Sequence, residues 1–170
     1  MTPMMEQYFE VKDKYKDYIL FYRLGDFYEM FFEDAQVASR ELELTLTGRD
    51  CGEEQRAPMC GVPYHSAEGY IGKLISAGYK VAICEQTEDP ALAKGLVNRE
   101  VIRVVTPGTL IESTLLPETR NNYLAALYSD DGSFGICFCD ISTAYMTSTV
   151  ITGADAETLL ANELSTYMPR

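Results

Sequence analysis

The sequence contains no long apolar run and no leader-like N-terminus. No stretch approaches the roughly 20 apolar residues that a membrane-spanning helix needs. Residues 1–7, Met-Thr-Pro-Met-Met-Glu-Gln, lack the basic flank and apolar core of a signal peptide. We therefore expect a globular, cytoplasmic protein with no membrane partner.

Residues that hold metals or nucleotides are also scarce. His65 is the single histidine, and the five cysteines form no Cys-x2-Cys pair. Cys137 and Cys139 lie two apart in a strand-like run, and the five cysteines are expected to be reduced and mostly buried. The sequence has neither a P-loop nor a dinucleotide fingerprint. It therefore predicts no metal site, no cofactor within these residues and no catalytic residue.

Basic residues are few. The chain has 14 lysines and arginines against 26 acidic residues, which gives a net charge of −12. The deficit is even, because residues 1–110 and residues 111–170 each have a net charge of −6. A protein that grips phosphates non-specifically is usually basic. Any contact with nucleic acid must therefore be local, or helped by residues outside this chain.

Residues 1–110 alternate between helical and strand-like patterns, which predicts an α/β (α+β) domain with a mixed sheet. Ser66 is expected to cap one helix and Asp34 another, shorter one. Helices are expected at 3–16, 34–41 and 67–77, strands at 18–24, 44–47, 81–84 and 101–106, a loop at 50–57, a turn at 88–90 and an extended segment at 58–64.

The pattern changes after this domain. Residues 111–121 are expected to form a linker, and residues 122–170 the first part of a second domain. This second part has three strand-like runs at 123–128, 134–141 and 145–151, then a helix at 155–167. Three strands and one helix are too few to cover a sheet, so we expect a piece of a larger protein. The order is similar to the opening of a ribonuclease H-like fold.

Asp140 leaves two interpretations open. In ribonuclease H-like nucleases an acid at this position helps to bind two metal ions, which makes a metal-dependent nuclease the alternative function. Such chemistry needs several converging carboxylates, and the later strands that would supply them are absent from this sequence. The other interpretation is structural, with Asp140 hydrogen-bonded at the turn to Ser142 or Thr143. His65 likewise is expected to be buried or to stabilise a turn.

Residues 25–32 hold the most informative pattern. An apolar strand is followed by Gly25-Asp26, which turns the chain and places Phe27 and Glu29 at its lip. Residues two apart on a strand point the same way, so these two side chains are expected to project together. A lone carboxylate beside an aromatic ring is unusual in a core, because an unpaired buried charge is costly. Such a pair suits a surface that inserts a ring between stacked bases. The ordinary alternative is an interaction domain with Phe27 in its core.

A series of motifs runs in order along nearly the whole chain, and together they are far more specific than any one. On these motifs the chain resembles the N-terminal part of the MutS family of bacterial DNA mismatch-recognition proteins. The motifs are Thr2-Pro3-Met4-Met5-x-Gln7-Tyr8, Phe21-Tyr22-Arg23-x-Gly25-Asp26-Phe27-Tyr28-Glu29, Leu46-Thr47-x-Arg49, Pro58-Met59-x-Gly61-Val62-Pro63-Tyr64-His65, Val81-Ala82-Ile83-Cys84-Glu85-Gln86, Val104-Val105-Thr106-Pro107-Gly108-Thr109 and Asp140-Ile141-Ser142-Thr143.

The resemblance implies roles for these parts. Phe27 would be the aromatic wedge that enters from the minor groove, and Glu29 the carboxylate that hydrogen-bonds the mispaired base. Residues 1–110 would be the mismatch-recognition domain, and the residues from 122 the start of a connector domain without nuclease activity. ATP, Mg and the ATPase activity would belong to a domain beyond residue 170. The full-length protein would be a homodimer that contacts other mismatch-repair proteins.

The wedge has a physical basis. Inserting a ring unstacks a base step at a cost of a few kcal/mol, and a mispaired base has already lost part of its stacking. Phosphate contacts are expected from Arg49, Arg99 and Arg103 and from the Pro58–Gly61 segment, including Met59. The main non-specific grip would lie elsewhere in the full-length protein. We therefore expect residues 1–170 alone to bind DNA weakly.

Overall fold

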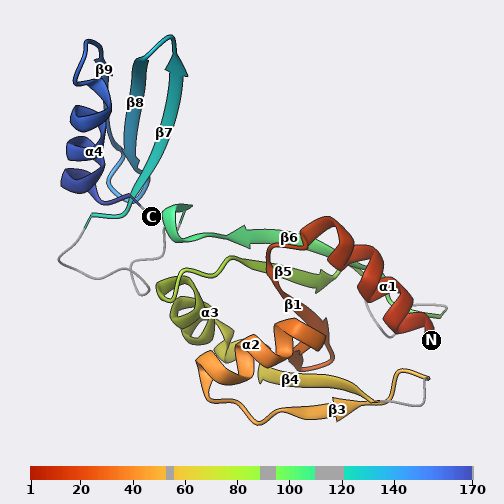
Figure 1. Cartoon of the computed structure of the whole chain (residues 1–170). Coiled ribbons are helices and arrows are strands. Elements are labelled where there is room, and N and C mark those ends of the chain that lie inside the picture. Colours follow the sequence, from red (N-terminus) through yellow and green to blue (C-terminus); the bar gives the residue numbers. More distant parts are fainter. Residues whose placement is uncertain (53–55, 89–94, 110–120, 170) are drawn as a thin grey trace. The chain divides into compact units, whose positions relative to one another are not determined.

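The computed structural model describes residues 1–52, 56–88, 95–109 and 121–169 (Figure 1). They divide into two compact units, Met1–Thr106 and Pro107–Arg170, called unit 1 and unit 2 below. Most of the predicted linker and part of the predicted turn at 88–90 lie outside the described residues.

Unit 1 is built on a mixed six-stranded sheet, which confirms the predicted fold class. Its strands lie in the order β3-β4-β2-β1-β5-β6, and among the described pairs only β1 and β5 run parallel. The parallel pair follows from the long connection between those strands, whereas β1 and β2 form a hairpin. The strands are β1 (Ile19–Leu24), β2 (Phe27–Phe31), β3 (Thr47–Arg49), β4 (Ala57–Pro63), β5 (Val81–Gln86) and β6 (Arg99–Val105).

Helices cover both faces of this sheet. Helix α1 (Pro3–Lys12) packs Met5 and Tyr8 on the face that carries Leu20, Tyr22 and Phe31. Tyr8 contacts Tyr22 and Phe31 edge to face, with ring centroids 5.4 and 5.1 Å apart. Helices α2 (Phe32–Leu42) and α3 (Ala67–Ser76) lie on the other face, where the Cys60 Sγ is 3.5 Å from the Ala35 carbonyl.

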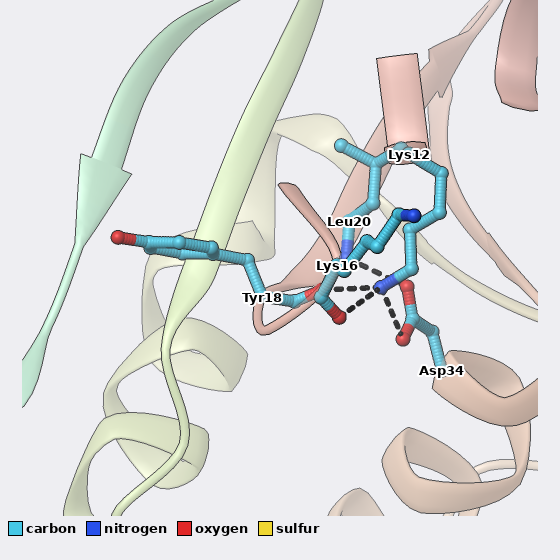
Figure 2. Close-up of polar contacts among 5 residues, drawn as sticks. All are labelled: Lys12, Lys16, Tyr18, Leu20 and Asp34. Atoms are coloured by element: carbon cyan, nitrogen blue, oxygen red, sulfur yellow. Dashed lines mark hydrogen bonds and ion pairs between the residues drawn. The ribbon is translucent and has the colours of Figure 1, made fainter. Parts of the chain in front are cut away.

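Asp34 is not the cap of α2, as the sequence had suggested, because the helix begins at Phe32. Its carboxylate is buried and accepts hydrogen bonds from Lys12 Nζ at 2.9 Å and from the Leu20 N–H at 3.0 Å (Figure 2). Lys12 Nζ also donates to the carbonyls of Tyr18 and Lys16. Burial raises the pKa of Asp34, although its hydrogen bonds to Leu20 and Lys12 oppose this. The residue therefore ties α1, β1 and α2 together.

Other boundaries differ in smaller ways. Helix α1 ends at Lys12 and continues as a 3₁₀ turn, Asp13–Tyr15, where one helix had been predicted. The third strand is Thr47–Arg49 and not 44–47, because Gly48 pairs with Pro58 on β4 instead of breaking the strand. Ser66 precedes α3, but its hydroxyl donates to the Pro63 carbonyl and does not cap the helix.

Unit 2 has the predicted three antiparallel strands and one helix. Strands β7 (Tyr123–Asp130), β8 (Ser133–Asp140) and β9 (Tyr145–Ile151) lie in that order, and α4 (Ala156–Tyr167) follows. Ile136 and Phe138 pack beneath α4, and Phe138 stacks on Tyr167 with centroids 4.1 Å apart. On the opposite face of the sheet, Tyr128, Met146 and Val150 are exposed.

Among the described residues, no helix is long and apolar enough to cross a membrane.

Candidate functional site

The β1–β2 hairpin places Phe27 at the end of the sheet. Gly25 and Asp26 form the turn, and Gly25 has a φ of +58°, a conformation that a residue with a Cβ adopts only with strain. Leu24 and Pro63 lie opposite Phe27 on the two neighbouring strands. The Gly25-Asp26 turn and the pairing with these two strands therefore determine the position of the Phe27 backbone.

The Phe27 side chain is 46% exposed, whereas Tyr28, Met30 and Phe31 on the same strand are buried. Core packing stabilises a protein by removing apolar surface from water, and nearly half of the surface of Phe27 stays in contact with water. Phe27 is therefore not a core residue, and the interpretation of this segment as an interaction domain with Phe27 in its core does not fit.

Glu29 lies on the same face of β2 as Phe27, as predicted. The sequence suggested a carboxylate without a charged partner, and in this respect the structure differs. The Glu29 carboxylate forms an ion pair with the Arg49 guanidinium. The Glu29 side chain is 14% exposed and that of Arg49 is 35% exposed. Gly61 lies opposite Glu29, and a Cβ at Gly61 would come within 3.4 Å of the Glu29 Cγ. The missing side chain at Gly61 thus leaves room for Glu29.

Arg99 is a correction to the predicted phosphate contacts. Arg99 is 8% exposed, and its Nε donates a hydrogen bond to the Arg23 carbonyl at 2.7 Å. Its Nη1 donates to Gln7 Oε1 and to the Val97 carbonyl, both at 2.9 Å. Because its guanidinium is buried and directed at internal acceptors, Arg99 stabilises the packing of α1 on the sheet and is not placed to reach a phosphate.

The other predicted phosphate contacts are distributed over three strands, β3, β4 and β6. Arg103 is on β6 and pairs with Glu68 at 3.3 Å. Pro58 and Met59 lie within β4, opposite Gly48 and Thr47 of β3. The structure brings Arg49, Met59 and Gly61 onto the face of Phe27 and Glu29. Arg99 also lies near this end of the sheet, where its guanidinium is used by internal acceptors, whereas Arg103 pairs with Glu68.

Sequence reasoning missed a cluster that braces the hairpin from the opposite face. Glu85 accepts hydrogen bonds from the Tyr28 hydroxyl and from Arg23 Nη1, the latter at 3.2 Å. The Arg23 guanidinium lies 3.6 Å from the centre of the Tyr64 ring, and its Nε donates to the Gly25 carbonyl. Burial, and then the hydrogen bond to Glu85, raises the pKa of Tyr28, so its hydroxyl stays a donor.

Asp140 has the structural surroundings of a turn residue. It is 1% exposed, and its carboxylate accepts hydrogen bonds from the Ser142 hydroxyl at 2.6 Å and from the N–H groups of Ser142 and Asn122 at 3.0 and 3.2 Å. The described part of the chain holds no group of three His, Cys, Asp or Glu side chains placed to bind a metal ion. Nothing in this arrangement favours the nuclease alternative.

His65 lies in a 3₁₀ turn, Tyr64–Ser66, where its side chain is exposed. Its ring contacts that of Tyr64 edge to face, with centroids 5.7 Å apart. The expected burial of His65 is therefore wrong; the residue lies in a turn, and its role in stabilising that turn stays a prediction.

Comparisons with known proteins agree with the motifs in the sequence. The family model described as MutS domain I matches residues 2–114. The chain is 62% identical over 169 residues to the DNA mismatch repair protein MutS of Acetivibrio thermocellus, covering 99% of this chain and 19% of that protein. It is 60% identical to MutS of Alkaliphilus oremlandii, covering 99% and 19%. It is 59% identical to MutS of Clostridium botulinum, covering 100% and 18%.

The chain thus spans about a fifth of the length of the curated relatives it matches. The matched family model covers unit 1 from residue 2 onward, including the hairpin that carries Phe27 and Glu29. On this evidence the chain belongs to the MutS domain I family.

Proposed function

We propose that unit 1 recognises mispaired or unpaired bases in duplex DNA, as the sensor of a mismatch-repair protein. Phe27 is the wedge that enters between bases from the minor groove, and Glu29 hydrogen-bonds the displaced base. One observation carries the proposal: a large aromatic ring stands 46% exposed at the end of the sheet, on the same face as a carboxylate.

The rigidity of the support suits a wedge. Phe27 is the first residue of a strand that is paired on both sides, and the Arg23, Tyr28 and Glu85 contacts hold the hairpin from behind. The backbone that carries the ring is therefore ordered before the ring inserts, so less conformational entropy is lost on binding. The inserted ring then unstacks a base step, which costs less where a mispair has already weakened stacking.

The proposal assigns the other parts of the protein to the residues after unit 1 and to a longer protein. Residues 111–121 are the linker, and residues 122–170 begin a ribonuclease H-like connector domain that has no nuclease activity. An ATPase domain that binds ATP and Mg, the contacts of a homodimer and the main grip on the DNA backbone belong to the remaining four-fifths of the length that the relatives have. The net charge of −12 supports this division, since it opposes tight binding by the 170 residues alone.

The test compares the full-length protein with its Phe27→Ala variant on a G·T duplex and a matched duplex. We expect wild type to bind the G·T duplex more tightly than the matched duplex. In Phe27→Ala the ratio of these two affinities should fall by more than about tenfold, since base stacking on an aromatic ring is worth about 1–3 kcal/mol. Ile102→Ala is the control, because Ile102 is also a large exposed apolar side chain of this sheet but lies on β6, three strands away from β2. An unchanged preference in Phe27→Ala would rule out the wedge.

A further inference from the structure

The ion pair between Arg49 and Glu29 connects two strands that are not neighbours. Arg49 ends β3 and Glu29 lies in the middle of β2, with β4 between them. The guanidinium therefore reaches across β4 to meet the carboxylate. Gly61 of β4 has no side chain to crowd Glu29 on this path. The contact is specific to the folded sheet and cannot arise from residues close in sequence.

The ion pair changes the charge that this face of the sheet presents. A carboxylate on a surface that approaches phosphates repels them, but a carboxylate neutralised by a guanidinium presents no net charge. The Glu29 side chain is mostly buried, so removal of Arg49 would leave an uncompensated charge that water solvates only in part. The Arg49 side chain is 35% exposed and its guanidinium has five N–H donors, so the ion pair with Glu29 leaves donors for a second acceptor.

We propose that Arg49 is a positioning residue that sets mismatch discrimination through Glu29. In the free protein Arg49 holds the Glu29 carboxylate in place. When Glu29 turns to a displaced base, Arg49 exchanges the carboxylate for a phosphate oxygen of the same duplex. On matched DNA no displaced base is offered, Glu29 keeps Arg49, and the phosphate contact is not made. This inference rests on the proposed function and adds a partner exchange to it.

The exchange differs from a simple phosphate contact in what it predicts. A cation that only binds phosphate strengthens matched and mismatched binding equally, whatever stands at position 29. Under the exchange, Arg49 contributes to the ratio of the two affinities, and that contribution depends on the carboxylate of Glu29.

The experiment measures the affinities of the full-length protein for G·T and matched duplexes in a double-mutant cycle. The variants are Arg49→Ala, Glu29→Gln, the double variant and Arg49→Lys. We expect Arg49→Ala to reduce the mismatch preference about tenfold in the wild-type background and by less than about twofold beside Glu29→Gln, a coupling typical of contacting charged groups. Arg49→Lys, which keeps the charge but loses the planar fork, should restore part of the preference. Arg40→Ala is the control, since Arg40 also pairs with an acid, Glu41, but on α2.

The outcomes separate the two proposals. Equal loss of affinity on both duplexes, the same in both backgrounds, would overturn the exchange and leave Arg49 an ordinary phosphate contact. If Phe27→Ala keeps the mismatch preference in the same assay, the proposed function itself fails. If Phe27→Ala abolishes the preference while the cycle is additive, only the exchange fails. Thermal unfolding of each variant excludes loss of folding as the cause, and Arg49→Lys supplies the test if Arg49→Ala does not fold.

Discussion

The backbone N–H of Tyr64 donates a hydrogen bond to the Asp26 carbonyl at 3.0 Å, which closes the end of β4 onto the turn before Phe27. Arg23 of β1 donates to the Gly25 carbonyl, so both residues of the turn have their carbonyls held, one from within the hairpin and one from the end of β4. The exposed ring of Phe27 is therefore carried by a turn that the rest of the sheet holds in one conformation.

The turn depends on the backbone conformation of Gly25, which glycine adopts more easily than other residues. Its φ is +58° and no atom lies within 4 Å of the place where a Cβ would stand, so substitution strains only the backbone. We expect Gly25→Ala to lower the free energy of unfolding by about 1 kcal/mol. Gly69→Ala is the control, because Gly69 has equal space but lies in α3, where alanine should stabilise by about 0.5–1 kcal/mol. Urea unfolding of both variants checks this; a Gly25→Ala chain as stable as wild type would contradict it.

The buried contacts of Arg99 predict a structural role. We expect Arg99→Ala to lower the free energy of unfolding by about 3 kcal/mol, because the acceptors on Gln7, Arg23 and Val97 would lose a charged donor. Arg103→Ala, which removes an exposed ion pair with Glu68, should cost about 0.5 kcal/mol. Urea unfolding of the two variants measures the difference. Equal stability of the two would show that Arg99 is not the anchor described above.

Asp140 should make unit 2 sensitive to acid. Burial raises its pKa, but hydrogen bonds from Ser142, Asn122 and Thr143 outweigh this and hold the pKa below its ordinary value of 3.8. A depressed pKa in the folded state means that the group stabilises the fold above the unfolded value. That stability is lost as the pH falls below about 4 and through the folded pKa.

We therefore expect Asp140→Asn to be less stable than wild type at pH 7 and to lose less stability between about pH 5 and pH 3. Hydrogen exchange of residues 122–170 at both pH values measures this. Asp155→Asn is the control, because the exposed Asp155 makes no side-chain cap hydrogen bond to α4. Identical acid sensitivity of Asp140→Asn and wild type would contradict the assignment.

The reactivity of the cysteine thiols tests how deeply they are buried in unit 1 and unit 2. Burial raises the pKa of Cys60 to about 11 and that of Cys84 to about 12, so few thiolates form there at neutral pH. Cys137 and Cys139 are only half-buried, on the sheet face of unit 2 away from α4. A thiol reagent should therefore modify these two first, and Cys137→Ser with Cys139→Ser should remove the fast phase. A fast phase that survives both substitutions would contradict the burial of the remaining thiols.

The sequence predicts local features better than long-range ones. The turn at Gly25 and the strand after it depend on neighbouring residues, and the structure has both. Asp34 could not be placed from its neighbours, because its partners are Lys12 and the Leu20 N–H. An acid before a helical pattern is typical of a cap, and only the tertiary packing of α1 on β1 decides otherwise.

The site shows the same limit. The position of Phe27 and Glu29 on one face follows from strand alternation, and the structure agrees. The Arg49 partner of Glu29 depends on the strand order β3-β4-β2, which no local pattern contains. The burial of Arg99 depends on Gln7, 92 residues away in the sequence. Charge alone cannot distinguish an arginine that faces solvent from one that anchors a helix.

Insertion of Phe27 into the base stack can be observed directly with the fluorescent base 2-aminopurine, placed beside a G·T mismatch, by following its emission as the full-length protein binds. Unstacking of the base raises its emission. We expect a rise with wild type that is absent with Phe27→Ala at saturating protein, and no rise on matched DNA with either protein. An equal rise with Phe27→Ala would contradict insertion of this ring into the base stack.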